Sequence, residues 1–489
     1  MKRVKFLALA ATLMFAAACS EPLDEAAEEL SPQKESIAVP EKQVCFTPEE
    51  MGYLTELANG TPKISVDSAA KVALSVMGNS SSLSKRSLSV TAFGTPKVGS
   101  LSKSFTDSDI DTTIFVFNAP GSNGFAVVAA DARIPQQVLA FSETGHFVLD
   151  SDNPAFSVFL DCAQNYAAEC IAEAQENRDS IENSILVKLG IKTEDAHKGL
   201  SKKEVLYKIL LTNMCTKHTS IEVVSEVKPM ITTNWYQSSP YNDNVKGGDT
   251  CNHCQAGCVA IATSQLVTYW RFPNIINSFR YDWNLISNDA NFDDPTYKNQ
   301  VASLVAFVGS SVGTNYGCDR SGADTPDAIR FLRRLGYSAP NLQSYGYDKI
   351  VNSLNNGCPV LMRGKREKKK KFLHTEHKGG HAWLVDGHVH QMIRTVSGLT
   401  YVVVERDDNG VVSSHYESGD TEYSLVDNKF LHINWGWGAR SNGYYSKDVF
   451  HVGERRLCDD NGRYVVVAPQ YNTDNVYQYQ LEIAVNIHK

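Results

Sequence analysis

The stretch "CNHCQAGCVAIATSQLVTYW", residues 251–270, puts three cysteines and a histidine into eight positions and then becomes apolar. The residues after Cys258 are apolar on nearly every side and Pro273 lies just beyond them, so the pattern predicts a buried helix that begins at Cys258. The free backbone N–H groups and the dipole at a helix start favour a thiolate. Small residues at 256 and 257 leave room for a substrate backbone. The stretch therefore indicates a nucleophilic cysteine.

The same cysteines also fit two other kinds of site, a zinc site and a disulfide. Cys251 and Cys254 are spaced as C-x-x-C, but a structural zinc ion is usually held by two such pairs. No second pair is evident in the sequence. We therefore expect no metal, and nothing in the sequence requires an organic cofactor. A disulfide that includes Cys251 or Cys254 stays open as an alternative.

A thiolate nucleophile needs a partner that takes and returns its proton. Among 13 histidines, His381 in "KGGHAWLVDGH" (378–388) is the best placed, because two glycines clear space on one side of it and a strand-like run follows. This arrangement suits the wall of a cleft. On spacing alone, a histidine on a strand is more often a surface or core residue.

The segment "FLHINWGWGARSNGYYS" (430–446) alternates tryptophan and glycine after an apolar strand. Asn434 is able to hydrogen-bond to an imidazole, and Trp435 and Trp437 are able to shield that contact from water. The alternative is a glycine-rich turn packed with aromatic side chains.

The N-terminus has the pattern of an export signal. A basic start precedes an apolar stretch, residues 6–18, which is too short to cross a bilayer because a spanning helix takes about 20 residues. Cys19 follows a run of alanines, which resembles the lipobox of bacterial lipoproteins, where the cysteine is lipidated; a plain secretory signal is the alternative. Ser20 resembles the sorting position of lipoproteins sent to the outer membrane. We expect residues 1–18 to be a signal peptide and the protein to be a lipid-anchored outer-membrane or cell-surface protein, or secreted after maturation.

The composition is that of a globular protein. The chain has 489 residues, of which 42% are hydrophobic and 21% charged, with a formal net charge of -8. A mildly acidic chain makes nucleic acid an unlikely main ligand, because phosphate binding requires a basic surface.

Composition divides the rest of the chain into three regions. Residues 19–42 are acidic and contain prolines, as in a flexible tether. Residues 43–226 form a first α+β domain with its linker, and residues 227–489, richer in glycine and aromatic residues, form a larger domain with a cleft.

The first domain has clear local patterns. Two strands are predicted at 112–119 and 124–131, separated by the turn "PGSN", and a helix is predicted at 156–175. Residues 176–226 are polar and charged, and we expect a linker with short helices there.

Six motifs occur in an order that resembles the streptopain family, papain-like cysteine proteases made as zymogens. They are "PYND" (240–243), "AGCVAIATSQLVTYWRFP" (256–273), "YDW" (281–283), "VGSSVGTNYG" (308–317), "GGHAWLVDG" (379–387) and "HINWGWGARSNGYY" (432–445). The segment at 114–147 is similar to the propeptide of that family.

The resemblance implies an α+β fold in which a papain-like catalytic domain, with a helical side and an antiparallel sheet side, follows an α+β propeptide. It implies a cysteine endopeptidase that hydrolyses peptide bonds through a Cys–His dyad. The partners are then protein or peptide substrates, the chain's own propeptide as inhibitor, and a lipid anchor. A Cys–His acyltransferase or amidase, and a non-catalytic surface binding protein on a protease scaffold, are the alternatives.

The resemblance also assigns roles to single residues. Cys258 is the nucleophile and His381 the general base and acid, while Gly380 contacts bound peptide through its backbone. Ser321, in "CDRSGAD", lies where the family has a substrate-binding stretch. The region of Asn434 and Trp435 orients and shields the histidine.

The chain departs from papain-like enzymes at the oxyanion donor, where a glutamine commonly stands six positions before the nucleophile. That position is Asn252 here, and Gln255 stands three before Cys258. Either amide is able to donate to an oxyanion, together with the backbone N–H of Cys258.

A further feature is the lysine-rich run at 365–371, which we expect to be a solvated loop. The alternatives are that it biases the rim of the cleft toward acidic substrates, or that it is cut during maturation.

Overall fold

The computed structural model describes most of the chain from residue 44 onward. The described ranges are 44–77, 87–96, 110–147, 154–188, 210–369, 375–406, 412–450, 455–458, 464–467 and 478–489. The predicted signal peptide, lipidated Cys19 and tether lie outside these ranges. Within them, no helix combines the length and apolar character needed to cross a membrane.

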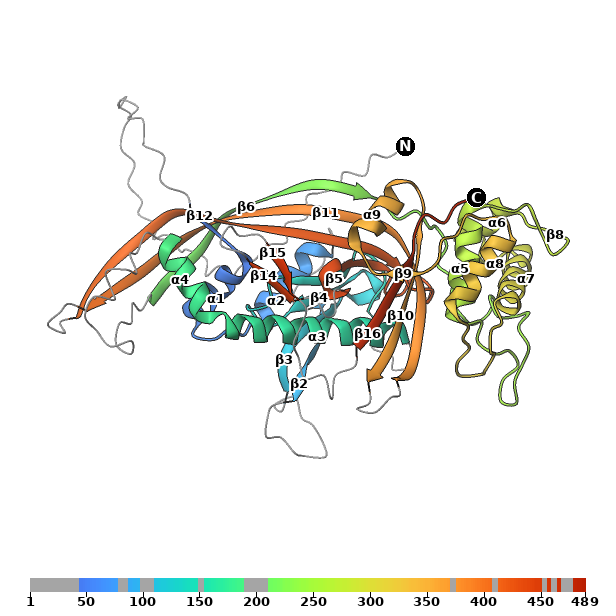
Figure 1. The fold of residues 1–489 in the computed structure, drawn as a ribbon, viewed down its shortest axis with the longest axis horizontal. Helices are drawn as coiled ribbons and strands as arrows, with labels where there is room; N and C mark the ends of the chain where they lie inside the picture. The colour runs from blue at the N-terminus through green and yellow to red at the C-terminus, as the bar shows by residue number, and fades with distance from the viewer. Residues whose placement is uncertain are drawn as a thin grey trace, which may run out of the picture.

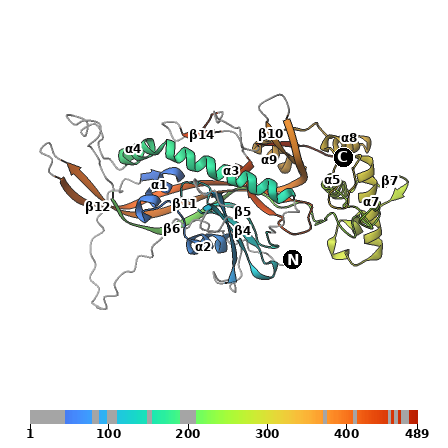
Figure 2. The ribbon, with the colours of Figure 1, turned by 90° about the horizontal axis from the view of Figure 1, so that it is seen from below.

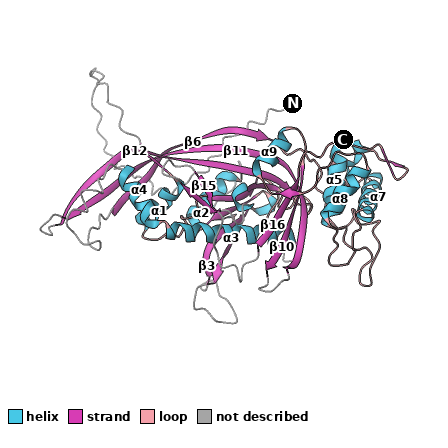
Figure 3. Ribbon diagram, viewed as in Figure 1, coloured by secondary structure: helices cyan, strands magenta, loops and turns pink. Residues whose placement is uncertain are grey.

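The fold is α+β, which confirms the predicted class. Helices α5 to α8 gather at one end of the molecule, and long strands run away from them toward the other end (Figures 1 and 3). This pair of sides matches the expected helical side and antiparallel sheet side.

The N-terminal part combines helices with strands that match the sequence patterns. Strands β3 and β4 cover the two predicted strands, and α3 covers the helix predicted at 156–175. In chain order the elements are β1 (Val44–Phe46), α1 (Pro48–Asn59), α2 (Val66–Val76), β2 (Ser89–Pro96), β3 (Ile110–Asn118), the 3-10 turn Pro120–Ser122, β4 (Phe125–Ala129), β5 (Val138–Ser142), α3 (Pro154–Glu176), α4 (Arg178–Lys188) and β6 (Leu210–Val227).

The C-terminal part begins with helices and ends with strands. Its elements are α5 (Cys258–Trp270), β7 (Ile275–Ile276), β8 (Phe279–Arg280), α6 (Trp283–Ile286), the 3-10 turn Asp289–Asn291, α7 (Pro295–Ser311), α8 (Thr325–Arg334), β9 (Gln343–Ser344), α9 (Tyr347–Asn355), β10 (Val360–Lys369), β11 (Thr375–Arg406), β12 (Val412–Asn434), β13 (Gly443–Ser446), the 3-10 turn Lys447–Phe450, β14 (Arg455–Cys458), β15 (Tyr464–Val467) and β16 (Gln478–Ala484).

One sheet joins the two parts. Its main path runs β2-β3-β4-β5-β13-β12-β11-β10-β16-β9, with β1 added on β12 and β6 on β11. The junction is the antiparallel pair of β5 with β13, in which Ala140 faces Tyr445 and Phe141 faces Tyr444. The N-terminal domain therefore shares backbone hydrogen bonds with the larger domain.

The predicted linker at 176–226 is wrong in part. Helix α4 lies in it, but β6 then runs for 18 residues along β11, from Leu210 opposite Val402 to Val227 opposite His388. A polar segment becomes a strand here because β11 offers it an open edge, and such pairing outweighs local propensity.

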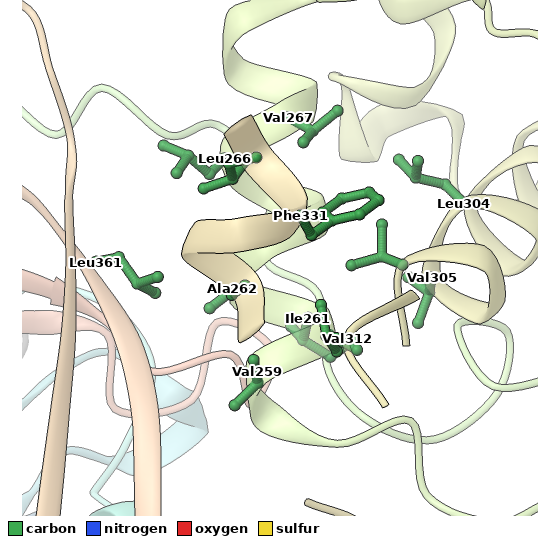
Figure 4. Packing of buried hydrophobic residues seen from close by; sticks show 14 of the residues in the cluster. Val259, Ile261, Ala262, Leu266, Val267, Leu304, Val305, Val312, Phe331 and Leu361 are labelled. Carbon is green, nitrogen blue, oxygen red and sulfur yellow. The ribbon is translucent and has the colours of Figure 1, made fainter. Parts of the chain in front are cut away.

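Helix α5 is buried in the middle of the helical side. Its Ile261, Leu266 and Val267 pack among Leu304 and Val305 of α7, with Phe331 of α8 and Leu361 of β10 closing the cluster (Figure 4). An apolar helix without a polar face requires such cover on all sides. The packing fixes the position of Cys258 at its first turn.

A second core lies between α3 and the sheet. Figure 2 shows α3 lying along the strands. Its Phe159 packs edge-on against Tyr445, with ring centroids 4.8 Å apart, and Tyr445 packs in turn against Trp435 at 5.3 Å. The N-terminal domain thus contacts Tyr445 directly and, through it, reaches Trp435.

Candidate active site

Cys258 is the first residue of α5, as predicted, and its side chain is buried. Gly257 before it has φ +89°, a conformation that side chains rarely adopt. A Cβ at Gly257 would also lie 3.4 Å from the carbonyl oxygen of Ser321. Glycine is therefore required immediately ahead of this cysteine, where the chain turns into the helix.

His381 lies on β11 opposite Gly364 of β10, and it is 2% exposed. Its Nε2 lies 2.8 Å from the carbonyl oxygen of Trp435, so Nε2 carries the proton and donates it to that carbonyl. Its Nδ1 is buried and has no hydrogen-bond partner among the described residues. The imidazole thus keeps one unprotonated nitrogen free to accept a proton.

The structure brings the two residues together in one pocket of about 620 Å³. Gly380 and Ser321, the two substrate-binding residues predicted from the sequence, line the same pocket. Ala382, the residue after His381, lines the pocket with Cys258, and its backbone N–H lowers the pKa of the Cys258 thiol and so favours its thiolate. The sulfur therefore lies beside the strand that carries the histidine.

Burial controls the protonation of both groups. It raises the pKa of the Cys258 thiol, against the lowering effect of nearby backbone N–H groups. It lowers the pKa of His381 to about 4, against the raising effect of the bond to Trp435. At pH 7 the full chain thus holds a neutral thiol beside a neutral imidazole.

Asn434 does not reach the imidazole. Its Nδ2 donates to the carbonyl oxygen of Thr233 at 2.8 Å, and its Oδ1 accepts from the backbone N–H of Gly436 at 3.1 Å and from Gln265 Nε2 at 3.3 Å. It holds the turn that presents the Trp435 carbonyl. The orienting group for His381 is thus a backbone oxygen, one residue further along than the expected amide.

Two tryptophans cover the imidazole. Trp383 is stacked on it, with the ring planes 16° apart and the centroids 6.0 Å apart, and Trp435 lies 6.2 Å away. The shielding role predicted for Trp435 fits this geometry, whereas Trp383 was not predicted. A signal existed, because residues two apart on a strand share a face and "HAW" puts Trp383 on the face of His381.

The two predicted oxyanion amides lie away from the pocket. Asn252 is exposed, and the Gln255 Oε1 accepts from Ser238 Oγ at 3.5 Å. Neither lines the pocket. The backbone N–H of Gln255 donates to the carbonyl oxygen of Gly317 at 3.1 Å. This bond holds the loop before Cys258 against residues 315–322.

Gln237 is an amide that the sequence analysis missed. Its backbone carbonyl accepts from the N–H of Ala256 at 2.9 Å, so it lies beside the turn that leads into Cys258. Gln237 is 5% exposed and, like Asn252 and Gln255, is not among the residues that line the pocket. A search limited to the residues just before Cys258 could not find it, although only two residues separate "NWYQ" (234–237) from the first family motif, "PYND" (240–243).

Of the two cysteines just before Cys258, Cys251 forms a disulfide and Cys254 does not. Cys251 is bonded to Cys318, 67 residues later, and Cys254 is a buried free thiol 3.9 Å from the Cys251 sulfur. The three sulfurs lie within 4.8 Å of one another, but the disulfide takes up two of them. The bond ties the loop before the nucleophile to the loop that carries Ser321.

Two family models match the chain. Residues 235–445 match the Peptidase C10 family, and residues 61–167 match the Spi protease inhibitor family. The first contains Cys258 and His381, and the second contains β3 to β5. The inhibitor match falls on the domain expected to be a propeptide.

Individual relatives are distant. Streptopain of Streptococcus pyogenes serotype M1 is 21% identical over 378 residues, 70% of this chain and 75% of its own length. The thiol protease/hemagglutinin PrtT of Porphyromonas gingivalis is 22% identical over 357 residues, 72% of this chain, which spans 36% of that relative.

Solved structures of one organism also match. A prointerpain A fragment of Prevotella intermedia is 19% identical with a TM-score of 0.44, covering 77% of this chain and 96% of its own. The active interpain A cysteine protease is 19% identical with a TM-score of 0.34, covering 55% of this chain and 97% of its own.

The family matches select the endopeptidase among the three alternatives that the sequence raised. The C10 match covers the domain with the candidate site, and the inhibitor match precedes it in the same chain. The chain therefore carries a Peptidase C10 family domain at residues 235–445 and is a streptopain-like cysteine protease, made as a zymogen.

Proposed function

We propose that Cys258 is the nucleophile of this endopeptidase and His381 its general base and acid. The observation that carries the assignment is that a buried cysteine at a helix start and a histidine with a free Nδ1 line one pocket. The test is hydrolysis of a peptide by the matured chain and by its Cys258→Ala and His381→Ala variants, in which each substitution should remove the activity.

The proposed reaction is acyl transfer to the cysteine followed by hydrolysis. Nδ1 of His381 takes the thiol proton as the sulfur of Cys258 bonds to the substrate carbonyl carbon, whose oxygen becomes an oxyanion. The imidazolium then protonates the leaving amine as the C–N bond breaks. Water that gives its proton to His381 attacks the thioester and releases the acid and the thiol.

We propose that Gln237, with the backbone N–H of Cys258, holds the oxyanion. Gln237→Ala should lower kcat by about 10²- to 10³-fold, because one oxyanion donor is worth that much in acyl transfer, while KM changes little. Gln255→Ala is the matched control, since the Gln255 Oε1 accepts a hydrogen bond from Ser238 Oγ at 3.5 Å. An equal loss of kcat in the control, or none in Gln237→Ala, would reject the assignment.

We propose that the N-terminal domain keeps the enzyme latent through the segment between Trp435 and β13. The backbone carbonyl oxygen of His146 accepts a hydrogen bond from Ser441 Oγ at 3.0 Å, and a Cβ at Gly145 would lie 2.8 Å from the carbonyl oxygen of Ala439. The same segment presents the Trp435 carbonyl to His381. Removing the domain frees this segment, so that the neutral pair is able to become the reactive thiolate and imidazolium.

We propose that the domains divide as the sequence suggests, with residues 43–226 as propeptide and linker and 227–489 as the mature enzyme. The maturation cut then falls between about 190 and 226. The described part of this region, β6, lies on the edge of β11 and so remains accessible on one side. The N-terminal sequence of the matured form locates the cut.

We propose that the precursor is an exported lipoprotein anchored through Cys19 in the outer membrane, at the cell surface or released after maturation. The support is the signal pattern at 1–18 with its lipobox-like end. Cys19→Ser should move the full-length precursor from the membrane to the soluble fraction, measured by cell fractionation with a labelled fatty acid. A membrane-bound Cys19→Ser precursor would contradict this proposal.

A further inference from the structure

The pocket that holds Cys258 and His381 is lined by three charged side chains, Asp324, Asp327 and Arg363. Arg363 is 9% exposed, and its guanidinium donates to Glu482 Oε2 from Nε at 2.9 Å and from Nη2 at 2.5 Å. Its charge is therefore neutralised inside the protein.

Asp327 is also neutralised. Its carboxylate forms an ion pair with Arg330, one turn further along α8. Two of the three charges that line the pocket are therefore taken up by partners within the protein.

Asp324 is different. It is the N-cap residue of α8, but its side chain makes no capping hydrogen bond, although an aspartate in this position commonly accepts from the first turn of its helix. It is exposed, and its carboxylate has no ion pair or hydrogen bond within the described ranges. The pocket thus keeps one negative charge that no described residue compensates.

The rest of the pocket wall suits the stem of a long cationic side chain. Val259, Gly313, Gly322 and Ala323 line it with small or apolar groups. Lysine and arginine lay their aliphatic stems along such surfaces and direct the charged end toward a polar partner. A wall of this kind beside a free carboxylate fits that chemistry.

We propose that this pocket is a subsite for a lysine or arginine side chain of the peptide substrate and that Asp324 is its specificity-determining residue. The inference rests on the proposed function, because it requires that peptide bonds be cleaved at Cys258.

The experiment compares pairs of peptides that differ at one position, where lysine is replaced by its neutral analogue norleucine. The matured chain should cleave the lysine peptide with a kcat/KM about five- to tenfold higher at one position near the cut, as expected for a partly exposed charge pair. Asp324→Asn keeps the shape of the residue and should bring that ratio close to one.

Salt supplies a second readout. The Debye length falls from about 10 Å at 0.1 M to about 3 Å at 1 M, so added salt should reduce the lysine-to-norleucine ratio of the wild type. The ratio of Asp324→Asn should not respond. A salt-insensitive preference in the wild type would overturn the charge-based inference.

The matched control is Asp293→Asn, which removes one charge from a fully exposed carboxylate that does not line the pocket. It should keep the wild-type ratio. A wild-type ratio near one at every position, or an unchanged ratio in Asp324→Asn, would overturn the proposal. Failure of the proposed function looks different, because then neither peptide is cleaved or cleavage persists in Cys258→Ala.

Discussion

Cys258→Ala is expected to abolish both peptide hydrolysis and the conversion of the precursor to a smaller form. Removing the nucleophile of a covalent mechanism should lower kcat by about 10⁴- to 10⁶-fold, because the remaining groups work only as a unit with it. The measurements are peptide hydrolysis by the matured enzyme and gel analysis of the incubated precursor.

Cys254→Ala is the matched control for this experiment. Cys254 is also a buried free thiol and stands four residues before Cys258. It lies next to the disulfide and does not line the pocket. The control should hydrolyse peptide and mature. If the Cys258→Ala precursor converts itself at the wild-type rate, another residue is the nucleophile.

His381→Ala should lower kcat by about 10³- to 10⁵-fold, since the thiol proton then has no acceptor and the leaving amine no donor. The same substitution should slow alkylation of Cys258 near neutral pH, which peptide mapping measures. A His381→Ala enzyme that retains a tenth or more of its activity would exclude this residue as the base.

His381 also has a pH signature in the precursor. Its pKa is about 4 in the folded chain against an ordinary value of 6.5. Below pH 6.5 His381 is protonated in the unfolded chain but stays neutral in the folded chain. The free energy of unfolding therefore decreases as the pH falls from 6.5 toward 4. At 1.36 kcal/mol per pKa unit, the decrease is at most about 3 kcal/mol.

Urea unfolding measures this decrease without self-cleavage if both proteins carry Cys258→Ala. The precursor with His381 should lose more stability between pH 7 and pH 4.5 than the same precursor with His381→Ala. Equal losses would mean that His381 is not held neutral by burial.

Local patterns predicted the parts of the site that depend on the chain nearby. An apolar run after small residues predicted the start of α5 at Cys258, and glycines beside a strand favoured His381. Their pairing came from the resemblance, because no local pattern specifies which of 13 histidines meets a given cysteine.

Other parts depend on contacts that only folding brings together. The partner of His381 is the Trp435 carbonyl, and a backbone oxygen carries no signal in the sequence. Cys318 lies 67 residues from Cys251, and nothing local connects them. Strand β6 was predicted as a linker because its residues are polar, and only the open edge of β11 makes it a strand.

The disulfide between Cys251 and Cys318 has a consequence for how this enzyme tolerates reducing agents. A thiol reductant protects the Cys258 nucleophile from oxidation, but thiolates also attack disulfides. Opening this bond removes the covalent tie between the loop before Cys258 and the loop whose Ser321 lines the pocket. A reductant therefore acts on the two sulfur centres in opposite ways, because it keeps the nucleophile reduced and removes the covalent tie between two loops at the pocket.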